Sequence, residues 1–70
     1  MSCVQAVTFD ASRWTPLEAK QWLRAHQFRA IKPVHRTKNR LRYRLHPPET
    51  FRHFATQVLD DGVELVIGFY

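Results

Sequence analysis

Cysteine and glycine are scarce in this sequence, and it has no long apolar run. Among 70 residues Cys3 is the only cysteine, so no disulfide can form within the chain. A lone cysteine is more typical of a reducing compartment than of a small secreted scaffold. The two glycines, Gly62 and Gly68, are too few to form a loop that cradles phosphate. No apolar run approaches the roughly 20 residues of a membrane-spanning helix, so we expect no membrane partner.

Patterns of catalytic and metal-binding residues are missing as well. Ser2 and Ser12 do not lie in the strand–turn–helix elbow that presents a serine nucleophile. A cysteine within a strand is usually a small packed hydrophobe. The four histidines include no pair four residues apart, and no cysteine pair accompanies them, so the spacing of zinc ligands is lacking. We therefore predict a protein that is not an enzyme and that uses no metal or other cofactor.

Length and composition indicate a single small domain over residues 1–70. A chain of this length buries only roughly 60% of its unfolded surface, so its stability margin is thin. The sequence is 44% hydrophobic and 13% aromatic, which is enough to fold and too apolar for a disordered tail. We expect a folded domain with room for one core.

Positive charge is concentrated in one segment of the chain. Residues 29–52 contain eight lysines and arginines against one acid, Glu49, whereas the rest of the chain has three basic and five acidic residues. The formal net charge of +5 therefore comes from this segment. Such an uneven distribution predicts one basic face.

The first part of the chain predicts a strand followed by a helix. Residues 3–9 predict a strand with mostly apolar residues on both of its faces, which is typical of a strand inside a sheet. Thr15, Pro16 and Glu18 form a capping box with proline at the first helical position. The buried stripe of this helix is expected to be Ala19, Trp22, Leu23 and His26.

The basic segment predicts a hairpin. Residues 28–35 and 40–46 would pair through the polar turn 36–39. Pro33 cannot donate to a ladder, so the first of these strands is expected at a sheet edge. In the second strand Arg40, Arg42 and Arg44 alternate with apolar residues and would share one face.

Residues 48–60 fit two structures. An apolar stripe with a proline near its start and Gly62 after its end favours a helix. The alternative is a turn at 48–53 followed by a strand at 54–60 that forms a hairpin through Asp61 and Gly62.

The predicted class is α+β: an antiparallel four-stranded sheet packed by one or two helices. The ferredoxin-like order βαββαβ is favoured, with βαβββ as the alternative.

The arginine-bearing strand and its turn form the candidate binding site. Arginine offers a planar fork of donors suited to phosphate, and alternate strand residues are about 6.6–6.8 Å apart, comparable to the phosphate spacing of a nucleic acid. The residues expected to bind nucleic acid are Arg36, Lys38, Arg40, Arg42, Arg44 and Arg52. Stacking of bases is not expected, because this face offers arginines rather than aromatics. An acidic protein surface is a second possible partner, and a solvated face with no partner is the third interpretation.

Several short runs resemble a family of small domains encoded by tailed phages and large DNA viruses, some attached to capsid-maturation proteases. The runs are 4–10 (VQAVTFD), 14–15 (WT), 18–23 (EAKQWL), His26, 37–39 (TKN), 42–44 (RYR) and 62–69 (GVELVIGF). The resemblance covers most of the chain and implies a viral or prophage setting. It implies no catalytic or ligand-binding residue, and it favours a strand over a helix near 54–62.

The residues and the resemblance together predict a non-enzymatic accessory protein that binds an anionic partner, foremost a nucleic-acid backbone. The alternative is a virion structural or assembly component, or a module that binds a protein partner, for example an inhibitor of a host protein. Its expected locations are the host cytoplasm or nucleus, or the virion, because the N-terminus lacks the basic flank of a secretion signal. Self-association or a larger assembly is a further expectation.

Overall fold

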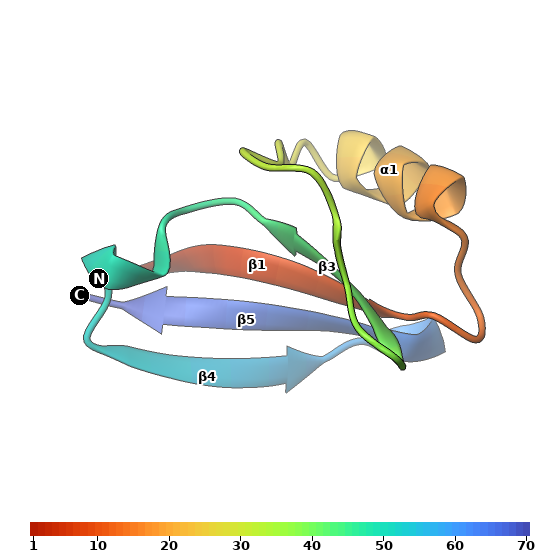
Figure 1. Cartoon of the computed structure of the whole chain (residues 1–70). Coiled ribbons are helices and arrows are strands. Elements are labelled where there is room, and N and C mark those ends of the chain that lie inside the picture. The colour runs from red at the N-terminus through yellow and green to blue at the C-terminus, as the bar shows by residue number, and fades with distance from the viewer.

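The computed structural model describes residues 1–59 and 61–70 in full and residue 60 by its backbone alone. The described backbone forms one helix, five strands and two short 3-10 turns (Figure 1). In chain order these are β1 (Ser2–Asp10), α1 (Pro16–Ala25), β2 (His35–Arg36), β3 (Arg40–Arg44), η1 (Pro48–Thr50), β4 (His53–Val58), η2 (Asp60–Gly62) and β5 (Val63–Phe69). The predicted α+β class and antiparallel sheet are confirmed.

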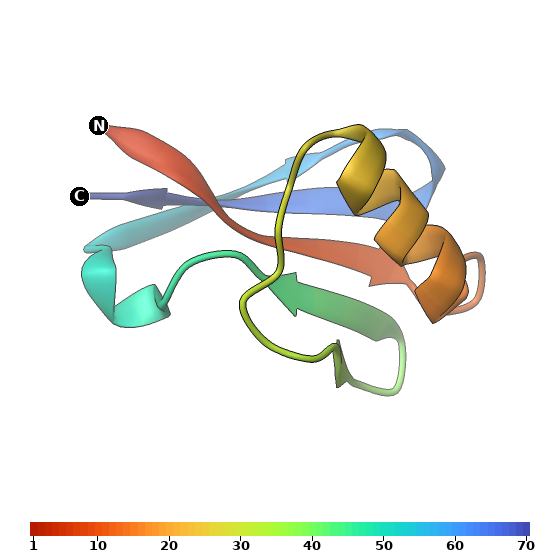
Figure 2. The same cartoon turned by 90° about the horizontal axis from the view of Figure 1, so that it is seen from above.

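All five strands belong to one antiparallel sheet in the order β2-β3-β1-β5-β4. β1 is its middle strand, as its apolar residues on both faces predict. β2 and β4 are the two edges. Helix α1 lies on one face and covers the end of the sheet where β1 finishes, whereas the end near both termini lies outside the helix (Figures 1 and 2).

Helix α1 begins at the predicted capping box. The Thr15 hydroxyl accepts a hydrogen bond from the Glu18 amide at 3.2 Å, and the Glu18 carboxylate accepts one from the Thr15 amide at 3.0 Å. Both bonds satisfy amides that have no partner within the helix. Ala19 and Leu23 are buried as expected, whereas His26 is exposed and stacks on the half-buried Trp22 ring.

The helix-side face of the sheet holds the core. Phe9 is fully buried, and its ring contacts those of Trp14, Trp22 and Tyr43 at centroid distances of 5.1 to 5.7 Å. Tilted and edge-on arrangements of this kind are the favoured aromatic geometries. The buried core cluster comprises Val7, Phe9, Ala19, Leu23, Leu41, Tyr43, Leu45 and Val63.

A bulge interrupts the alternation of side chains along β1. The register with β5 shifts between Val4 and Ala6, so Gln5 is an extra residue in the ladder. Beyond the bulge, Thr8 pairs with Arg42 on the face opposite α1. We call this surface the open face.

The second predicted strand is much shorter than expected. Residues 28–34 form a loop, and only His35 and Arg36 pair with β3 as β2. Pro33 removes a donor from this stretch, yet the Ile31 amide still donates to the Arg44 carbonyl at 2.9 Å. The predicted edge position is correct, and the predicted length is wrong.

The favoured ferredoxin-like order is wrong because residues 53–58 form strand β4 instead of a helix. The hairpin from β4 to β5 turns through Asp61 and Gly62, which have φ of 62° and 76°. Glycine adopts this left-handed conformation without strain, and aspartate tolerates it better than most residues. The strand alternative for 54–60 is therefore correct, and the sheet has one strand more than the predicted four.

Gly68 lies where the ring of Phe51 crosses the open face. A Cβ atom at Gly68 would stand only 2.4 Å from the Phe51 ring. The missing side chain thus lets Phe51, which is 8% exposed, pack directly on β5. A glycine within a strand is found at bulges and where another group approaches closely, and at Gly68 the approaching group is the Phe51 ring.

No helix in the described part of the chain is long and apolar enough to cross a membrane.

Candidate nucleic-acid interface

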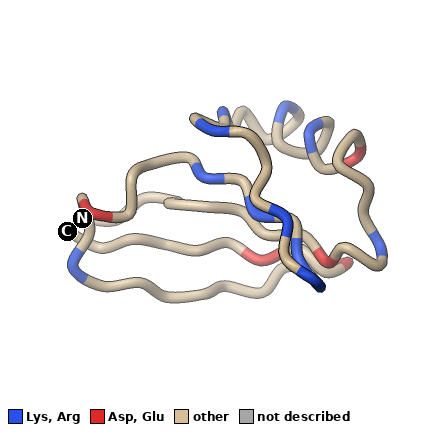
Figure 3. The backbone as a smooth tube through the Cα atoms, in the orientation of Figure 1, with Lys and Arg blue, Asp and Glu red and all other residues tan. Residues whose placement is uncertain are grey.

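Basic residues gather around the β2 edge of the sheet. Figure 3 shows lysines and arginines along β3, in the turn before it and in the loop that precedes β2. The three arginines of β3 are half-buried and lie on the open face, as the alternation predicts. They differ in their contacts, and these differences decide which of them is available to a ligand.

Arg40 is engaged within the sheet. Its guanidinium donates to the Glu64 carboxylate at 2.7 Å and to the Gly62 carbonyl at 3.3 Å. The two side chains of the ion pair are 35% and 25% exposed. Because two nitrogens of its guanidinium are already engaged, one of them by a carboxylate, Arg40 is the least available of the three.

Arg42 is held by the bulge in β1. Its guanidinium donates to the Gln5 side-chain oxygen at 3.2 Å, while the Gln5 amide group donates to the His46 carbonyl at 2.8 Å. The Nε atom of Arg42 and the hydroxyl of its cross-strand partner Thr8 are buried without a hydrogen-bond partner among the described residues. Buried polar groups without partners are costly.

Arg44 has no side-chain hydrogen bond or ion pair among the described residues. It lines a hollow of about 200 Å³ together with Lys32, Pro33, His35 and Arg42. We call this feature the Arg44 hollow. Three cationic side chains and a histidine line it, and no acidic residue does. Its positive charge is therefore uncompensated by its own lining.

Arg36 and Lys38 line a different hollow, of about 600 Å³, with Arg40 and Asp10. Hydrogen bonds from the Ser12 hydroxyl, at 2.7 Å, and from the Ser12 amide lower the pKa of the Asp10 carboxyl, and Arg40 and Arg13 act in the same direction. A carboxylate that stays ionised in this way repels phosphate. The turn is consequently a weaker anion site than the Arg44 hollow.

Arg52, the last predicted site residue, is not brought together with the others. It lies just before β4, and its amide donates to the Phe69 carbonyl. β4 and β2 are opposite edges of the sheet, so Arg52 lies away from the basic residues around β2. The structure thus groups Arg42 and Arg44 with residues absent from the predicted set, namely Lys32 and His35.

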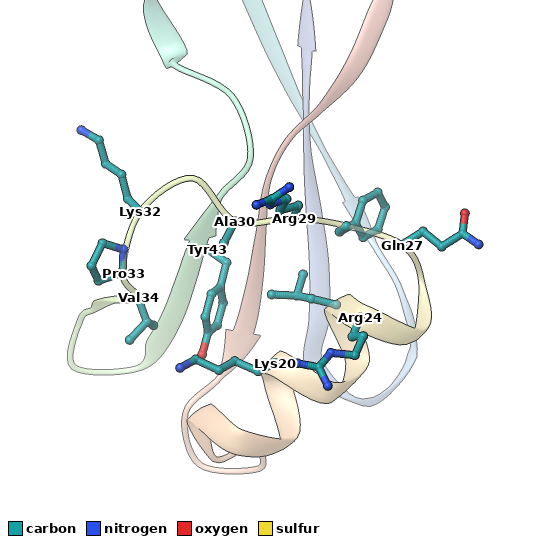
Figure 4. A pocket seen from close by; sticks show the side chains of 11 residues that line it. Lys20, Arg24, Gln27, Arg29, Ala30, Lys32, Pro33, Val34 and Tyr43 are labelled. Carbon is teal, nitrogen blue, oxygen red and sulfur yellow. The ribbon is translucent and has the colours of Figure 1, made fainter.

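A larger cleft lies on the helix side of the same edge. It has a volume of about 720 Å³ and an apolar floor that includes Leu23 and Tyr43. In Figure 4 the Tyr43 ring stands between α1 and the loop that carries Pro33 and Val34. The basic residues around the cleft are Lys20, Arg24, Arg29 and Lys32. Burial raises the pKa of the Tyr43 hydroxyl, which donates to the Pro16 carbonyl at 3.3 Å.

Lys32 lines both the cleft and the Arg44 hollow. The basic surface therefore continues around the edge of the sheet, from the helix side to the open face. The concentration of charge in residues 29–52 could have indicated Arg29 and Lys32. Lys20 and Arg24 belong to a helix that the sequence shows only as amphipathic, so their approach to the same edge depends on the tertiary fold.

Cys3 contacts two polar side chains near the termini. Its sulfur lies 3.7 Å from His46 Nδ1 and 3.6 Å from the Tyr70 hydroxyl. The hydrogen bond to Cys3 raises the pKa of Tyr70, and burial adds to the shift. Among residues 1–59 and 61–70, no three histidine, cysteine or acidic side chains gather as a metal site.

Comparison of the chain with family models, with curated proteins and with solved structures finds no match in any of the three.

Proposed function

We propose that this protein binds the phosphate backbone of a nucleic acid at the Arg44 hollow. The observation that carries the proposal is the convergence of Lys32, Arg42 and Arg44 on one small hollow without an acid in its lining. Arginine and lysine side chains at such a site attract phosphate and release the counterions that surround it. The basic surface continues past Lys32 to the larger cleft, where neighbouring phosphates of the same nucleic-acid backbone would find further basic side chains.

The contacts of Arg42 support the same role. Among the described residues its guanidinium makes one side-chain hydrogen bond, to the neutral amide oxygen of Gln5, and it has no ion pair with a carboxylate. A phosphate at the hollow would add an acceptor of opposite charge, and arginine–phosphate pairs are among the strong charge-assisted hydrogen bonds. Arg40 gains less, since Glu64 already neutralises it.

The lining of the hollow favours backbone contacts without base recognition. Pro33 and His35 are its only ring-bearing residues, and Phe, Tyr and Trp are absent from the lining. Base readers on sheets use such aromatics as stacking platforms. Phosphate contacts fix a protein on a nucleic acid without reading its sequence. We therefore expect little preference for sequence.

The resemblance to phage-encoded and virus-encoded domains supplies the proposed setting. The protein would act as a non-enzymatic accessory factor in the infected cell or in the virion. Its partner there would be nucleic acid, with an acidic protein surface as the competing candidate, because both present closely spaced anionic groups.

Retention on three supports tests the proposal: immobilised duplex nucleic acid, immobilised polyglutamate and an uncharged resin. We expect retention on the nucleic acid that salt reverses, weaker retention on polyglutamate and none on the uncharged resin. Arg44→Gln should elute from the nucleic acid at lower salt than Arg13→Gln, which removes the same charge from an exposed site outside the Arg44 hollow. Equal elution of the two variants, or stronger binding to polyglutamate, would contradict the proposal.

A further inference from the structure

Strand β4 is an open edge with none of the features that usually protect one. All six of its residues, His53–Val58, are exposed, and none is lysine, arginine, aspartate, glutamate or proline. Phe54 is 47% exposed and Val58 is 71% exposed. Edge strands normally avoid unwanted pairing by being short, charged, bulged or proline-bearing. β4 is therefore well suited to pair with another strand.

The backbone groups that β4 offers can be assigned from its pairing with β5. The Leu59 amide donates to the Val63 carbonyl at 2.8 Å. Because successive residues of a strand direct their hydrogen-bonding groups to opposite sides, Gln57 and Ala55 also bond toward β5. The N–H and C=O groups of Phe54, Thr56 and Val58 consequently point outward, away from the sheet.

This pattern is self-complementary in one antiparallel register. If Thr56 faces Thr56 of a second copy, Phe54 of each chain faces Val58 of the other. All three outward-facing residues are then used, and each pair exchanges two hydrogen bonds. Their side chains lie together on the open face, since Phe54 pairs with Gly68 and Val58 with Glu64 in β5. An aromatic residue opposite a β-branched one is a favourable cross-strand pair.

Charge at the ends of β4 selects the antiparallel direction. Arg52 precedes the strand and the acidic Asp61 follows it. Antiparallel pairing brings the basic end of one chain beside the acidic end of the other, whereas parallel pairing would place like charges together. Exposed ion pairs are individually weak, but like charges in apposition disfavour the competing arrangement.

We propose that two copies of this chain pair through β4 to form a symmetric dimer with a continuous sheet. The two-fold axis passes between the Thr56 residues, and both Arg44 hollows remain free at the outer edges. This inference is independent of the proposed function, because β4 and β2 are opposite edges. An extended segment of another protein is the competing occupant of the same edge.

Residue-by-residue amide hydrogen exchange on the unaltered chain shows whether a second copy pairs with the β4 edge or whether the edge is left to another protein. Amides of Ala55 and Gln57 bond to β5 and should be protected in monomer and dimer alike. Amides of Phe54, Thr56 and Val58 should become protected only as protein concentration rises, in step with the molar mass from sedimentation equilibrium. A monomer at millimolar concentration with these three amides unprotected would overturn the proposal and leave the edge to another protein.

A charge swap tests the axis itself. Thr56→Lys and Thr56→Glu each place like charges opposite one another across the seam, so each variant alone should be monomeric. An equimolar mixture of the two should recover a dimer, because lysine then faces glutamate. Val58→Ala serves as the matched control, because it removes apolar contact between the two β4 strands without placing like charges at the two-fold axis. It should weaken the dimer only partly.

Two outcomes of the swap would also overturn the proposal. One is a dimer that neither Thr56 variant disturbs, which would place the seam elsewhere. The other is a mixture that stays monomeric while both variants retain the melting profile of the folded domain. If a variant fails to fold, the exchange pattern of the unaltered chain decides the question.

Discussion

The two edges of the sheet differ in length, charge and neighbours. β2 contributes only His35 and Arg36, is preceded by a proline-bearing loop and lies among basic side chains. β4 has six residues, all exposed and free of Lys, Arg, Asp and Glu. Short, basic edges resist strand addition and attract anions, whereas long uncharged edges invite pairing. We therefore propose opposite roles for the two edges of the sheet: anion binding near β2 and pairing with a second copy at β4.

The largest expected effect comes from disturbing the strand pair that carries the β4 edge. Gly68→Ala would drive a methyl group into the Phe51 ring, since the new Cβ would lie 2.4 Å from it. Overpacking of this kind costs about 1–3 kcal/mol, and the ring can yield only by leaving its site. We expect a clear fall in the midpoint of chemical denaturation.

A double-mutant cycle separates this contact from a general effect on β5. In a Phe51→Ala background the same Gly68→Ala change should cost much less, because the obstructing ring is gone. Equal costs in both backgrounds would show that the Phe51 ring is not what excludes a side chain at position 68.

The next largest effect is the loss of stability when the N-terminal cap of helix α1 is removed. Thr15→Ala removes the acceptor for the Glu18 amide and should cost roughly 0.5–2 kcal/mol. Thermal melting followed by circular dichroism measures the loss. Thr15→Ser is the matched control, because serine keeps the capping hydroxyl and should retain most of the stability.

A smaller change should strengthen the basic edge. Glu64→Gln releases Arg40 from its ion pair, at a cost to stability of about 1 kcal/mol for a partly exposed pair. The freed guanidinium can then contact phosphate. The salt dependence of nucleic-acid binding should steepen by up to about 0.9 in slope. No change in slope would mean that Arg40 lies outside the path of the backbone.

The smallest effect is the pH response of Asp10. Its pKa is below the ordinary value of 3.8, chiefly through the hydrogen bonds from Ser12. A lowered folded-state pKa stabilises the protein above the unfolded pKa, and this stabilisation disappears as pH falls through the folded value. The difference in melting temperature between the native chain and Asp10→Asn should therefore be constant above about pH 5 and shrink below it.

Local signals in the sequence predicted the local structure well. The capping box at Thr15 and the interior position of β1 both depend on residues that are close together in the sequence. The ferredoxin-like order failed because the apolar residues of 51–59 fit a helical stripe and a strand about equally. Long-range pairing with β5 decides between the two, and no local pattern records it.

The candidate site was predicted in part for the same reason. Alternation placed the β3 arginines on one face, which the structure shows. Sequence alone could not show that Arg40 forms an ion pair with Glu64, or that Arg42 bonds to Gln5 in the β1 bulge. It also could not show that the loop before β2 brings Lys32 to the same hollow as Arg44. These contacts join residues more than ten positions apart, and only the tertiary fold determines them.

The central claim is that the charge in the Arg44 hollow, rather than basic charge in general, binds the nucleic-acid backbone. The decisive measurement is the slope of log affinity against log salt for duplex binding by Lys32→Gln/Arg44→Gln. Each phosphate contact contributes about 0.9, so we predict a slope smaller by up to about 1.8 than that of the native chain. Arg13→Gln/Arg52→Gln removes as much charge elsewhere and should leave the slope nearly unchanged. Equal slopes for the two double variants, with both folded, would contradict the account.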